Sequence, residues 1–242
     1  MKKGRIHIGT SGWHYKHWKD VFYPPETKEK DQFAYYCQKF NTVELNNSFY
    51  RLPTAATFTS WKKQSSQKFI FSVKASRYIT HMKKLKPDAA SRDNFFSHAG
   101  KLDSKLGPIL FQLPPKWNIN TERLATFLSK LPKEHVYTFE FRDQSWYQEG
   151  VYSLLRKYNC AFCIYELGGH QSPMEETADF IYIRLHGPGS KYQGSYTDNA
   201  LKEWADRCKR WQKKGKDVYL YFDNDQKGYA TFNAGKLKIL IQ

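Results

Sequence analysis

The stretch VYTFEF, residues 136–141, alternates aromatic with polar side chains and carries Glu140, with Arg142 directly after it. This alternation is typical of a β-strand whose two faces have different surroundings. Burial of a charged group is costly unless the group is paired or binds a ligand. Glu140 and Arg142 therefore indicate a functional site at this strand, where an ionised carboxylate can act as a general base or hold a ligand hydroxyl.

Three other strand-like stretches also place ionisable side chains late in the run. They carry Glu44, Lys74, and Arg184 with His186. In a closed parallel barrel one face of each strand packs under helices and the other points into the interior, and active sites form at the carboxyl ends of the strands. We therefore predict that these side chains point inward and line a polar pocket. The alternative is an interior network in which the charges only neutralise one another.

Several kinds of chemistry suit these residue types. Glu44, Glu140 and His186 are candidates for acid–base catalysis, and Lys74 is a candidate Schiff-base nucleophile or a counter-ion. A divalent metal bound by Glu44, Glu140, Glu166 and His186 is conceivable, but no His/Asp cluster has ligand spacing. We therefore predict neither a metal nor another cofactor.

The segment HGPGSKYQGSYTDN, residues 186–199, has the composition of a ligand-binding loop. Gly187 and Gly194 let backbone N–H groups approach an anion, and Lys191 adds positive charge. Barrel folds often bind phosphate at the loops after the last two strands. The segment predicts an anionic or phosphorylated ligand, and the alternative is a flexible surface turn.

The order of elements along the chain predicts the fold class. Strand-like stretches alternate with helical ones, which is the pattern of βα units and a parallel sheet. We expect strands at 5–10, 42–46, 69–75, 108–113, 136–141, 161–166, 180–186 and 217–222, and helices at 29–40, 55–64, 91–103, 121–131, 148–158, 198–214 and 228–240. Only the gap after the sixth strand has no clear helix. Eight strands and seven helices predict an α/β fold, a (β/α)8 TIM barrel, as one domain over residues 1–242.

The composition limits the class of protein and its partners. The chain has 242 residues and a formal net charge of +16, which favours anionic partners and makes nucleic acid a candidate. Neither a signal peptide nor an apolar run long enough to span a membrane is recognisable, so we expect a cytoplasmic protein. The four cysteines are scattered and are expected to be reduced core residues.

Seven ordered motifs over the whole length resemble those of the DUF72 (YecE-like) family of TIM-barrel proteins. The matching stretches are IGTSGWHYKHW (8–18), FNTVELNNSFYRLP (40–53), FSVKASRYITH (71–81), LGPILFQLPP (106–115), FEFRDQSW (139–146), RLHGPGSKYQGSY (184–196) and YFDNDQKGYATFNA (221–234). The resemblance implies a barrel with a polar pocket lined by Trp13, Tyr15, Glu44, Asn47, Tyr50, Lys74, His81, Gln112, Glu140, Arg142, Arg184, His186, Tyr192 and Asn224. It implies no reaction. The family commonly has Asn-Asn-His after its last strand, where this chain has Asp223, Asn224 and Asp225.

Aromatic side chains are abundant in the same loops. We expect part of them to stack on a sugar face or a nucleobase and the rest to pack in the core. Trp146, as a wall or lid of the pocket, and Tyr196 complete the predicted ligand-binding set.

Two classes of function remain open on the sequence alone. The first is an enzyme that acts on a small anionic, phosphorylated or sugar-like substrate. The second is a nucleic-acid-binding or processing protein that uses the positive charge. Basic residues occur both after the third strand, at 81–88, and before the last strand, at 208–217, which are opposite ends of a barrel. This distribution favours the enzyme over a single nucleic-acid groove.

Overall fold

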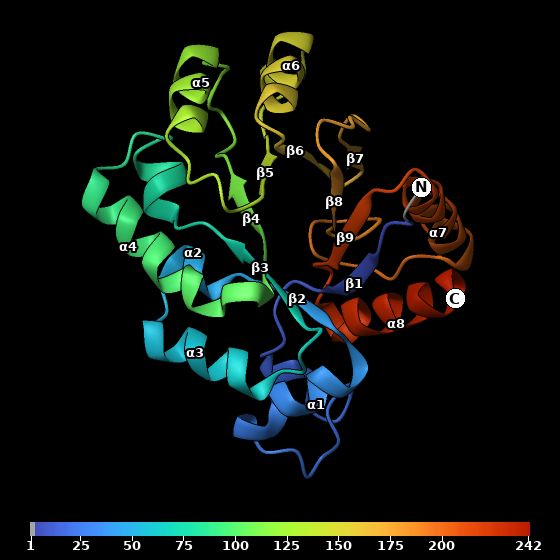
Figure 1. Ribbon diagram of the computed structural model, residues 1–242. Helices are drawn as coiled ribbons and strands as arrows, with labels where there is room; N and C mark the ends of the chain where they lie inside the picture. The colour runs from blue at the N-terminus through green and yellow to red at the C-terminus, as the bar shows by residue number, and fades with distance from the viewer. Residues whose placement is uncertain (1–2) are drawn as a thin grey trace. The chain divides into compact units, whose positions relative to one another are not determined.

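The computed structural model describes residues 3–242 (Figure 1). Its strands are β1 (Ile6–Thr10), β2 (Thr42–Leu45), β3 (Ile70–Lys74), β4 (Leu106–Gln112), β5 (Tyr137–Glu140), β6 (Ala161–Leu167), β7 (His170–Gln171), β8 (Phe180–Leu185) and β9 (Asp217–Phe222). The strand order is β1-β9-β8-β6-β5-β4-β3-β2, with β7 attached to the edge of β6. The predicted fold class, a (β/α)8 TIM barrel, is confirmed.

The helices are α1 (Gln32–Lys39), α2 (Asn47–Tyr50), α3 (Ala55–Gln64), α4 (Ala89–Ala99), α5 (Thr121–Ser129), α6 (Glu149–Lys157), α7 (Asp198–Lys213) and α8 (Tyr229–Ile241). All eight predicted strands and seven predicted helices occur within a few residues of their expected positions. Residues 168–179 contain β7 and no helix, as predicted for that gap. The sequence patterns did not predict α2, β7 or a π-helical turn at Tyr78–Met82, because each is too short to show a hydrophobic period.

The chain divides into two compact units. Among the described residues, the first unit contains 3–44, 164–174 and 180–242, and the second contains 45–163 and 175–179. In the first unit β1, β9 and β8 pair in parallel, and α7 and α8 pack together beside them (Figure 1). Buried side chains recur along α7 at three- and four-residue spacing, at Leu201, Trp204, Cys208 and Trp211. This spacing puts them on one face of the helix, which covers the sheet.

The second unit contains β3, β4 and β5 in parallel register, with α3 to α6 around them. The aromatic face of β5 packs under the helices, because Phe139 lies 5.2 Å from Phe111 of β4 and 6.3 Å from Phe127 of α5, between ring centres. Phe141 stacks on Trp146 at 5.0 Å. The predicted outward direction of the β5 aromatics is therefore confirmed, and Glu140 lies on the other face.

Cysteine burial agrees with the predicted core role of these residues. Cys160, Cys163 and Cys208 are buried, and Cys37 is half-buried. Burial raises the pKa of Cys160 and of Cys208 to about 12, so these two thiols stay protonated at neutral pH.

Gly9 determines how closely β1 approaches β2 in the first unit. A Cβ added at Gly9 would lie 2.3 Å from the carbonyl oxygen of Thr42, and the two strands continue to pair beyond this point through Ser11 and Glu44. A methyl group there must displace backbone, because a carbonyl of a paired strand cannot rotate away. Gly9 therefore keeps β2 close enough to β1 for Glu44 to reach its partners.

We expect Gly9→Ala to lower the free energy of unfolding by about 1–3 kcal/mol, the usual cost of overpacking a buried position. Gly150→Ala is the matched control, since a Cβ at Gly150 in α6 meets no atom within 4 Å. That substitution should be neutral or stabilise the protein by up to about 1 kcal/mol. Urea denaturation of both variants measures the difference, and equal effects would show that β1 and β2 do not approach this closely.

Candidate functional site

Arg184 and Glu44 form a buried ion pair in the first unit. Arg184 is 1% exposed and Glu44 is fully buried. The Arg184 Nη2 atom lies 2.7 Å from Glu44 Oε1, and Nε lies 2.9 Å from Oε2. This two-point geometry is the strongest form of an arginine–carboxylate pair. Burial of the Glu44 carboxylate in β2 and of the Arg184 guanidinium in β8 is possible because each charge compensates the other.

Four further side chains complete this cluster, which we call the acidic cluster: Ser11, Tyr182, His186 and Asp223 join Glu44 and Arg184. The Tyr182 hydroxyl donates to Glu44 Oε2 at 2.6 Å, and the Ser11 hydroxyl donates to Oε1. Arg184 also donates from Nη2 to Asp223 at 3.0 Å. Glu44 thus accepts hydrogen bonds from Arg184, Tyr182 and Ser11, and Arg184 donates to both Glu44 and Asp223. In the first unit this arrangement corresponds to the alternative stated above, an interior network whose charged side chains pair with one another.

The His186 imidazole is held between two charged groups. Its Nδ1 lies 2.9 Å from Asp223 Oδ2, and its Nε2 lies 3.2 Å from Arg184 Nη1. A guanidinium can only donate, so Nε2 is the acceptor in the contact with Arg184. The Tyr192 ring lies edge-on to the His186 ring, with 5.3 Å between the ring centres. The imidazole thus lies between Asp223 and Arg184.

The loop from Gly187 to Tyr196 is fixed by its own hydrogen bonds. Gly187 has φ +106°, and a Cβ there would lie 2.1 Å from the Gln193 carbonyl oxygen, so only glycine fits. Its N–H donates to the Tyr196 hydroxyl at 3.1 Å, and the Asn224 amide donates to the Gly194 carbonyl at 2.8 Å. In this structure the Gly187 N–H is used inside the loop, and its role in anion binding stays a prediction.

Tyr196 and Asn224 therefore hold the loop and do not face a ligand. Tyr196 is 4% exposed and Asn224 is fully buried. Asn224 also donates to Asn233 at 2.9 Å, which ties the loop to α8. Their predicted contact with a ligand is corrected to a positioning role. Lys191 and Tyr192 remain exposed on the outer side of the same loop.

An open pocket of about 720 Å³ lies beside this loop in the first unit. It is lined by His17, Val21, Lys191, Tyr192, Gln193, Asp225, Gln226 and Lys227. His17 Nε2 lies 3.4 Å from the Asp225 carboxylate. Burial and the nearby Asp223 carboxylate raise the pKa of Asp225. The pocket thus combines two lysines, Lys191 and Lys227, with one carboxylate, that of Asp225.

In the second unit Glu140 is completely buried at the end of β5, as the strand pattern predicts for an inward charge. The Arg142 Nε–H donates to its Oε1 atom, and the Cys163 Sγ lies 3.8 Å from Oε2. The pair places a guanidinium at the carboxyl end of β5, where Gln112 of β4 is in register with Glu140. Arg142 therefore provides a counter-charge for the buried Glu140 carboxylate.

Lys74 at the end of β3 lies close to His81. The Lys74 ammonium is 4.3 Å from the centre of the Phe49 ring, and the edge-on His81 ring contacts Phe49 at 5.0 Å. His81 belongs to the π-helical turn Tyr78–Met82, and its Nδ1 lies 3.0 Å from the Thr80 hydroxyl. Such turns are rare and are frequently found at functional sites.

Positive charge dominates around His81. Burial, followed by the cations Lys74, Arg77 and Arg142, lowers the pKa of His81 to about 4, although Glu140 acts in the opposite direction. The imidazole is therefore neutral at pH 7. We call these five residues, Lys74, Arg77, His81, Glu140 and Arg142, the basic cluster. It contains three permanent cations and one carboxylate.

The remaining predicted ligand-binding residues differ in accessibility. Tyr50 is 80% exposed beside Phe49, and Asn47, at the start of the same short helix, is exposed. Trp146 has no exposed surface, and its indole N–H donates to the Trp117 carbonyl at 2.6 Å. It packs beneath the strand end, so its predicted role as a pocket wall or lid is corrected to a core role.

In the first unit Trp13 and Tyr15 follow β1 and are half-buried. The Trp13 ring packs on Phe33 at 4.7 Å, and the Tyr15 hydroxyl donates to the Ser11 carbonyl. Burial, followed by the carboxylates of the acidic cluster and Asp225, raises the pKa of Tyr15. Tyr15 therefore stays a neutral donor at the edge of the acidic cluster.

The predicted set of site residues did not include Ser11, Tyr182 or Asp223. Tyr182 has the same inward parity as Arg184, and Asp223 directly follows β9, so the strand pattern that identified the other residues also applies to these two. Ser11 lies one residue beyond β1 and carries no charge that could single it out. The predicted metal candidate Glu166 accepts hydrogen bonds from Tyr196 and Trp204.

No group of three or more His, Cys, Asp and Glu side chains within residues 3–242 is arranged to hold a metal ion. No helix in the same range is both long and apolar enough to cross a membrane. The cytoplasmic location stays a prediction.

Comparison with known proteins agrees with the fold and with the motifs that carry these clusters. The family model described as "Protein of unknown function DUF72" matches residues 7–242. The chain belongs to the DUF72 family. The UPF0759 protein YunF of Bacillus subtilis (strain 168) is 25% identical over 98% of this chain and 94% of its own length. The UPF0759 protein YecE of Escherichia coli (strain K12) is 26% identical over 60% of this chain and 51% of its own length.

Among solved structures, a DUF72 family protein from Thermotoga maritima MSB8 superimposes with a TM-score of 0.89. It is 27% identical in sequence, and the match covers 98% of this chain and 99% of that protein. A DUF72 family protein from Enterococcus faecalis V583 has a TM-score of 0.80 at 17% identity, over 98% of this chain and 95% of that one, which supports the fold alone.

We expect Glu44→Gln to lower the free energy of unfolding by about 3–5 kcal/mol, because it leaves the buried Arg184 guanidinium without its main counter-charge. Glu149→Gln, which removes an exposed partner of Arg156, is the matched control and should change little. Urea denaturation at pH 7 compares the two. Similar small effects in both variants would contradict a stabilising role of the Glu44–Arg184 pair.

The stability of the protein should fall on acidification partly because of His81. Its pKa of about 4 in the folded protein lies below the ordinary value of 6.5, so the unfolded chain binds more protons between these values. The free energy of unfolding therefore falls as the pH drops from about 6.5 to about 4. We expect His81→Gln to lose less stability than wild type between pH 7 and pH 5 in urea denaturation, whereas His14→Gln, which removes an exposed histidine, keeps the wild-type loss. An unchanged loss in His81→Gln would contradict the lowered pKa.

Proposed function

We propose that the protein is an enzyme that binds a small anionic substrate, such as a phosphate monoester, at the basic cluster and transforms it by acid–base chemistry. The observation that carries this proposal is the excess of positive charge around His81. Lys74, Arg77 and Arg142 all lower the pKa of His81, and Glu140 raises it. A partly buried group of like charges is unfavourable unless an anion compensates it.

Lys74 is better suited to bind an anion than to act as a Schiff-base nucleophile. Its ammonium lies over the face of the Phe49 ring at 4.3 Å. A cation–π contact stabilises the charged form, whereas a nucleophilic lysine must be neutral. Lys74 therefore acts as a counter-ion to the substrate.

We assign the acid–base role to His81 because of its position in the basic cluster. Its neutral imidazole is half-exposed and lies among the cations, and its Nδ1 contacts the Thr80 hydroxyl, which leaves Nε2 as the nitrogen for proton exchange. When an anion binds, its negative charge offsets that of Lys74, Arg77 and Arg142, and the pKa of His81 rises towards neutrality. His81 thus becomes a usable base once the substrate is bound.

The exposed Tyr50 ring supports a substrate with a flat or sugar-like part. Tyr50 contacts Phe49 edge-on at 5.0 Å, and Phe49 in turn contacts both Lys74 and His81. An aromatic ring beside a cationic group suits a ligand that joins an anionic group to a planar or sugar face. A hydrolase, lyase or isomerase reaction on a sugar phosphate combines these requirements without a metal ion.

Isothermal titration calorimetry with ribose 5-phosphate tests the binding step. We expect binding to wild type and at least tenfold weaker binding to Lys74→Gln and to Arg142→Gln, because each removes one cation from the cluster. Lys63→Gln, on α3, removes an equal charge elsewhere in the same unit and should bind as wild type does. Equal affinities in all four proteins would contradict the proposal.

The catalytic step is tested with a panel of phosphate monoesters followed by ¹H and ³¹P NMR in deuterated buffer. We expect hydrolysis, isomerisation or exchange of a carbon-bound hydrogen for at least one compound, and loss of this activity in His81→Gln while binding is retained. Full activity in His81→Gln would assign the acid–base role to another residue.

A further inference from the structure

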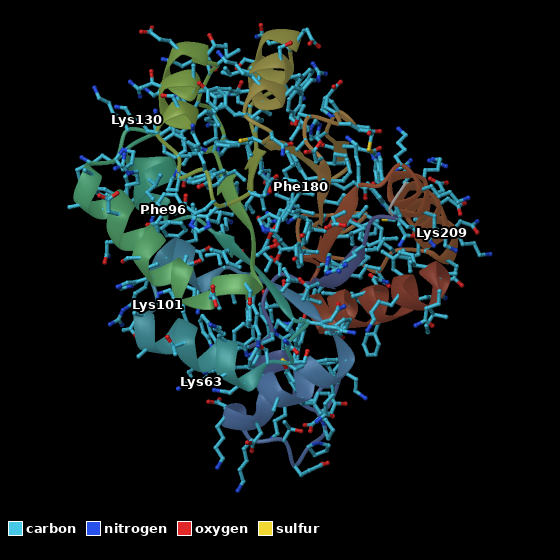
Figure 2. All side chains as sticks on the ribbon, viewed as in Figure 1. Lys63, Phe96, Lys101, Lys130, Phe180 and Lys209 are labelled. Atoms are coloured by element: carbon cyan, nitrogen blue, oxygen red, sulfur yellow. The ribbon has the colours of Figure 1, made fainter. Side chains whose placement is uncertain are left out.

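A second cationic pocket lies outside both clusters, in the second unit. Its volume is about 300 Å³. It lies among α4, α5 and the segment that precedes α4, and its lining residues are Leu85, Lys86, Pro87, Arg92, Asn120, Glu122, Arg123, Thr126, Phe127 and Lys130. None of these residues belongs to the basic cluster. Lys130, labelled in Figure 2, directly follows α5.

Four cations and one carboxylate line this pocket. Arg92 is paired with Asp93 at 3.0 Å, so its charge is already compensated. No carboxylate in the part of the chain that the structure describes lies within ion-pair distance of Lys86, Arg123 or Lys130. Even with Glu122 at the rim, the pocket keeps an excess of positive charge, which attracts an anion and raises its local concentration.

The floor of the same pocket is apolar. Leu85 is 3% exposed and Phe127 is 4% exposed, and Pro87 lies beside them. Ligand sites typically combine such an apolar floor with a few polar groups that fix orientation, and 300 Å³ is at the small end of their range. A longer polyanion such as a nucleic-acid strand needs an extended groove, which a pocket of about 300 Å³ does not provide.

The segment that forms one wall has an unusual backbone. Lys84 and Leu85 have φ values of +46° and +64°, a left-handed conformation that costs residues other than glycine of order 1 kcal/mol each. It is maintained by the burial of Leu85 and by the Leu85 N–H, which donates to the Ile79 carbonyl at 2.9 Å. Strain of this kind is concentrated at ligand-binding segments. The wall that carries Lys86 and Pro87 is therefore fixed before any ligand binds.

From the pocket's volume, charge and apolar floor, we infer that it binds a small phosphorylated ligand with a flat or apolar part, of the size of a nucleoside monophosphate. Arg123, Lys86 and Lys130 contact the phosphate, and Phe127 and Pro87 contact the flat part. Arginine suits a phosphate because its planar guanidinium donates two hydrogen bonds side by side, and lysine suits it as a compact positive charge. This site is separate from the basic cluster and does not depend on the proposed reaction.

Calorimetric titration of the full chain with AMP tests this inference. We expect wild type to bind AMP and the double variant Arg123→Gln/Lys130→Gln to bind it at least tenfold more weakly. Arg210→Gln/Lys213→Gln, which removes the same charge from the exposed side of α7, should bind as wild type does. AMP is also a phosphate monoester of the class proposed for the basic cluster, so each titration is repeated in the Lys74→Gln background. AMP binding that persists in Lys74→Gln and is weakened when Arg123→Gln/Lys130→Gln is added belongs to this pocket, so failure here and failure of the proposed function are distinguishable.

Three results would overturn the inference. The first is no AMP binding to wild type. The second is equal weakening in both double variants, which would show attraction to net charge alone. The third is tighter binding of a single-stranded oligonucleotide than of AMP, lost in both double variants, which would assign the pocket to a nucleic-acid surface. The thermal unfolding midpoint of each variant is also measured. A midpoint equal to that of wild type shows that the variant is folded and that its loss of binding has another cause.

Discussion

A charge that is buried at the end of a β-strand must be compensated, and this constraint governs both charged clusters. In the first unit both carboxylates of the acidic cluster pair with Arg184. The Arg184 guanidinium donates to Glu44 and Asp223 and lies against His186, while Tyr182 donates to the other side of Glu44. A network of this kind fixes the ends of β2, β8 and β9, and its stabilising effect depends on every member being present.

In the second unit cations outnumber carboxylates in the basic cluster, and we assign function there for that reason. Glu140 is paired with Arg142, and the three cations Lys74, Arg77 and Arg142 all lower the pKa of His81. A stable fold has no need of such an arrangement, since apolar side chains could fill the same space. An anionic substrate would remove the imbalance and would also increase the basicity of the imidazole. Binding and catalysis then have one electrostatic origin.

Much of this could be predicted from the sequence because strands have a fixed period of two. That period puts Glu44, Glu140 and Arg184 on the inner face of their strands. It could not identify His81's turn, since a π-helical turn of five residues has no hydrophobic pattern. The loop residues were the least predictable. Trp146 and Tyr196 look like ligand contacts by type, but each packs inward because a hydrogen-bond partner is available for its polar atom. Which loop aromatic is buried depends on contacts between segments that are distant in the sequence.

The pKa of His81, followed by NMR of histidine-labelled protein, tests the central claim most directly. Without ligand the imidazole should titrate near pH 4, because burial and three cations disfavour its protonation. With saturating inorganic phosphate the midpoint should rise by one unit or more, since an anion at the basic cluster offsets those cations. A midpoint that phosphate leaves unchanged would contradict the account, because it would show that no anion binds beside His81.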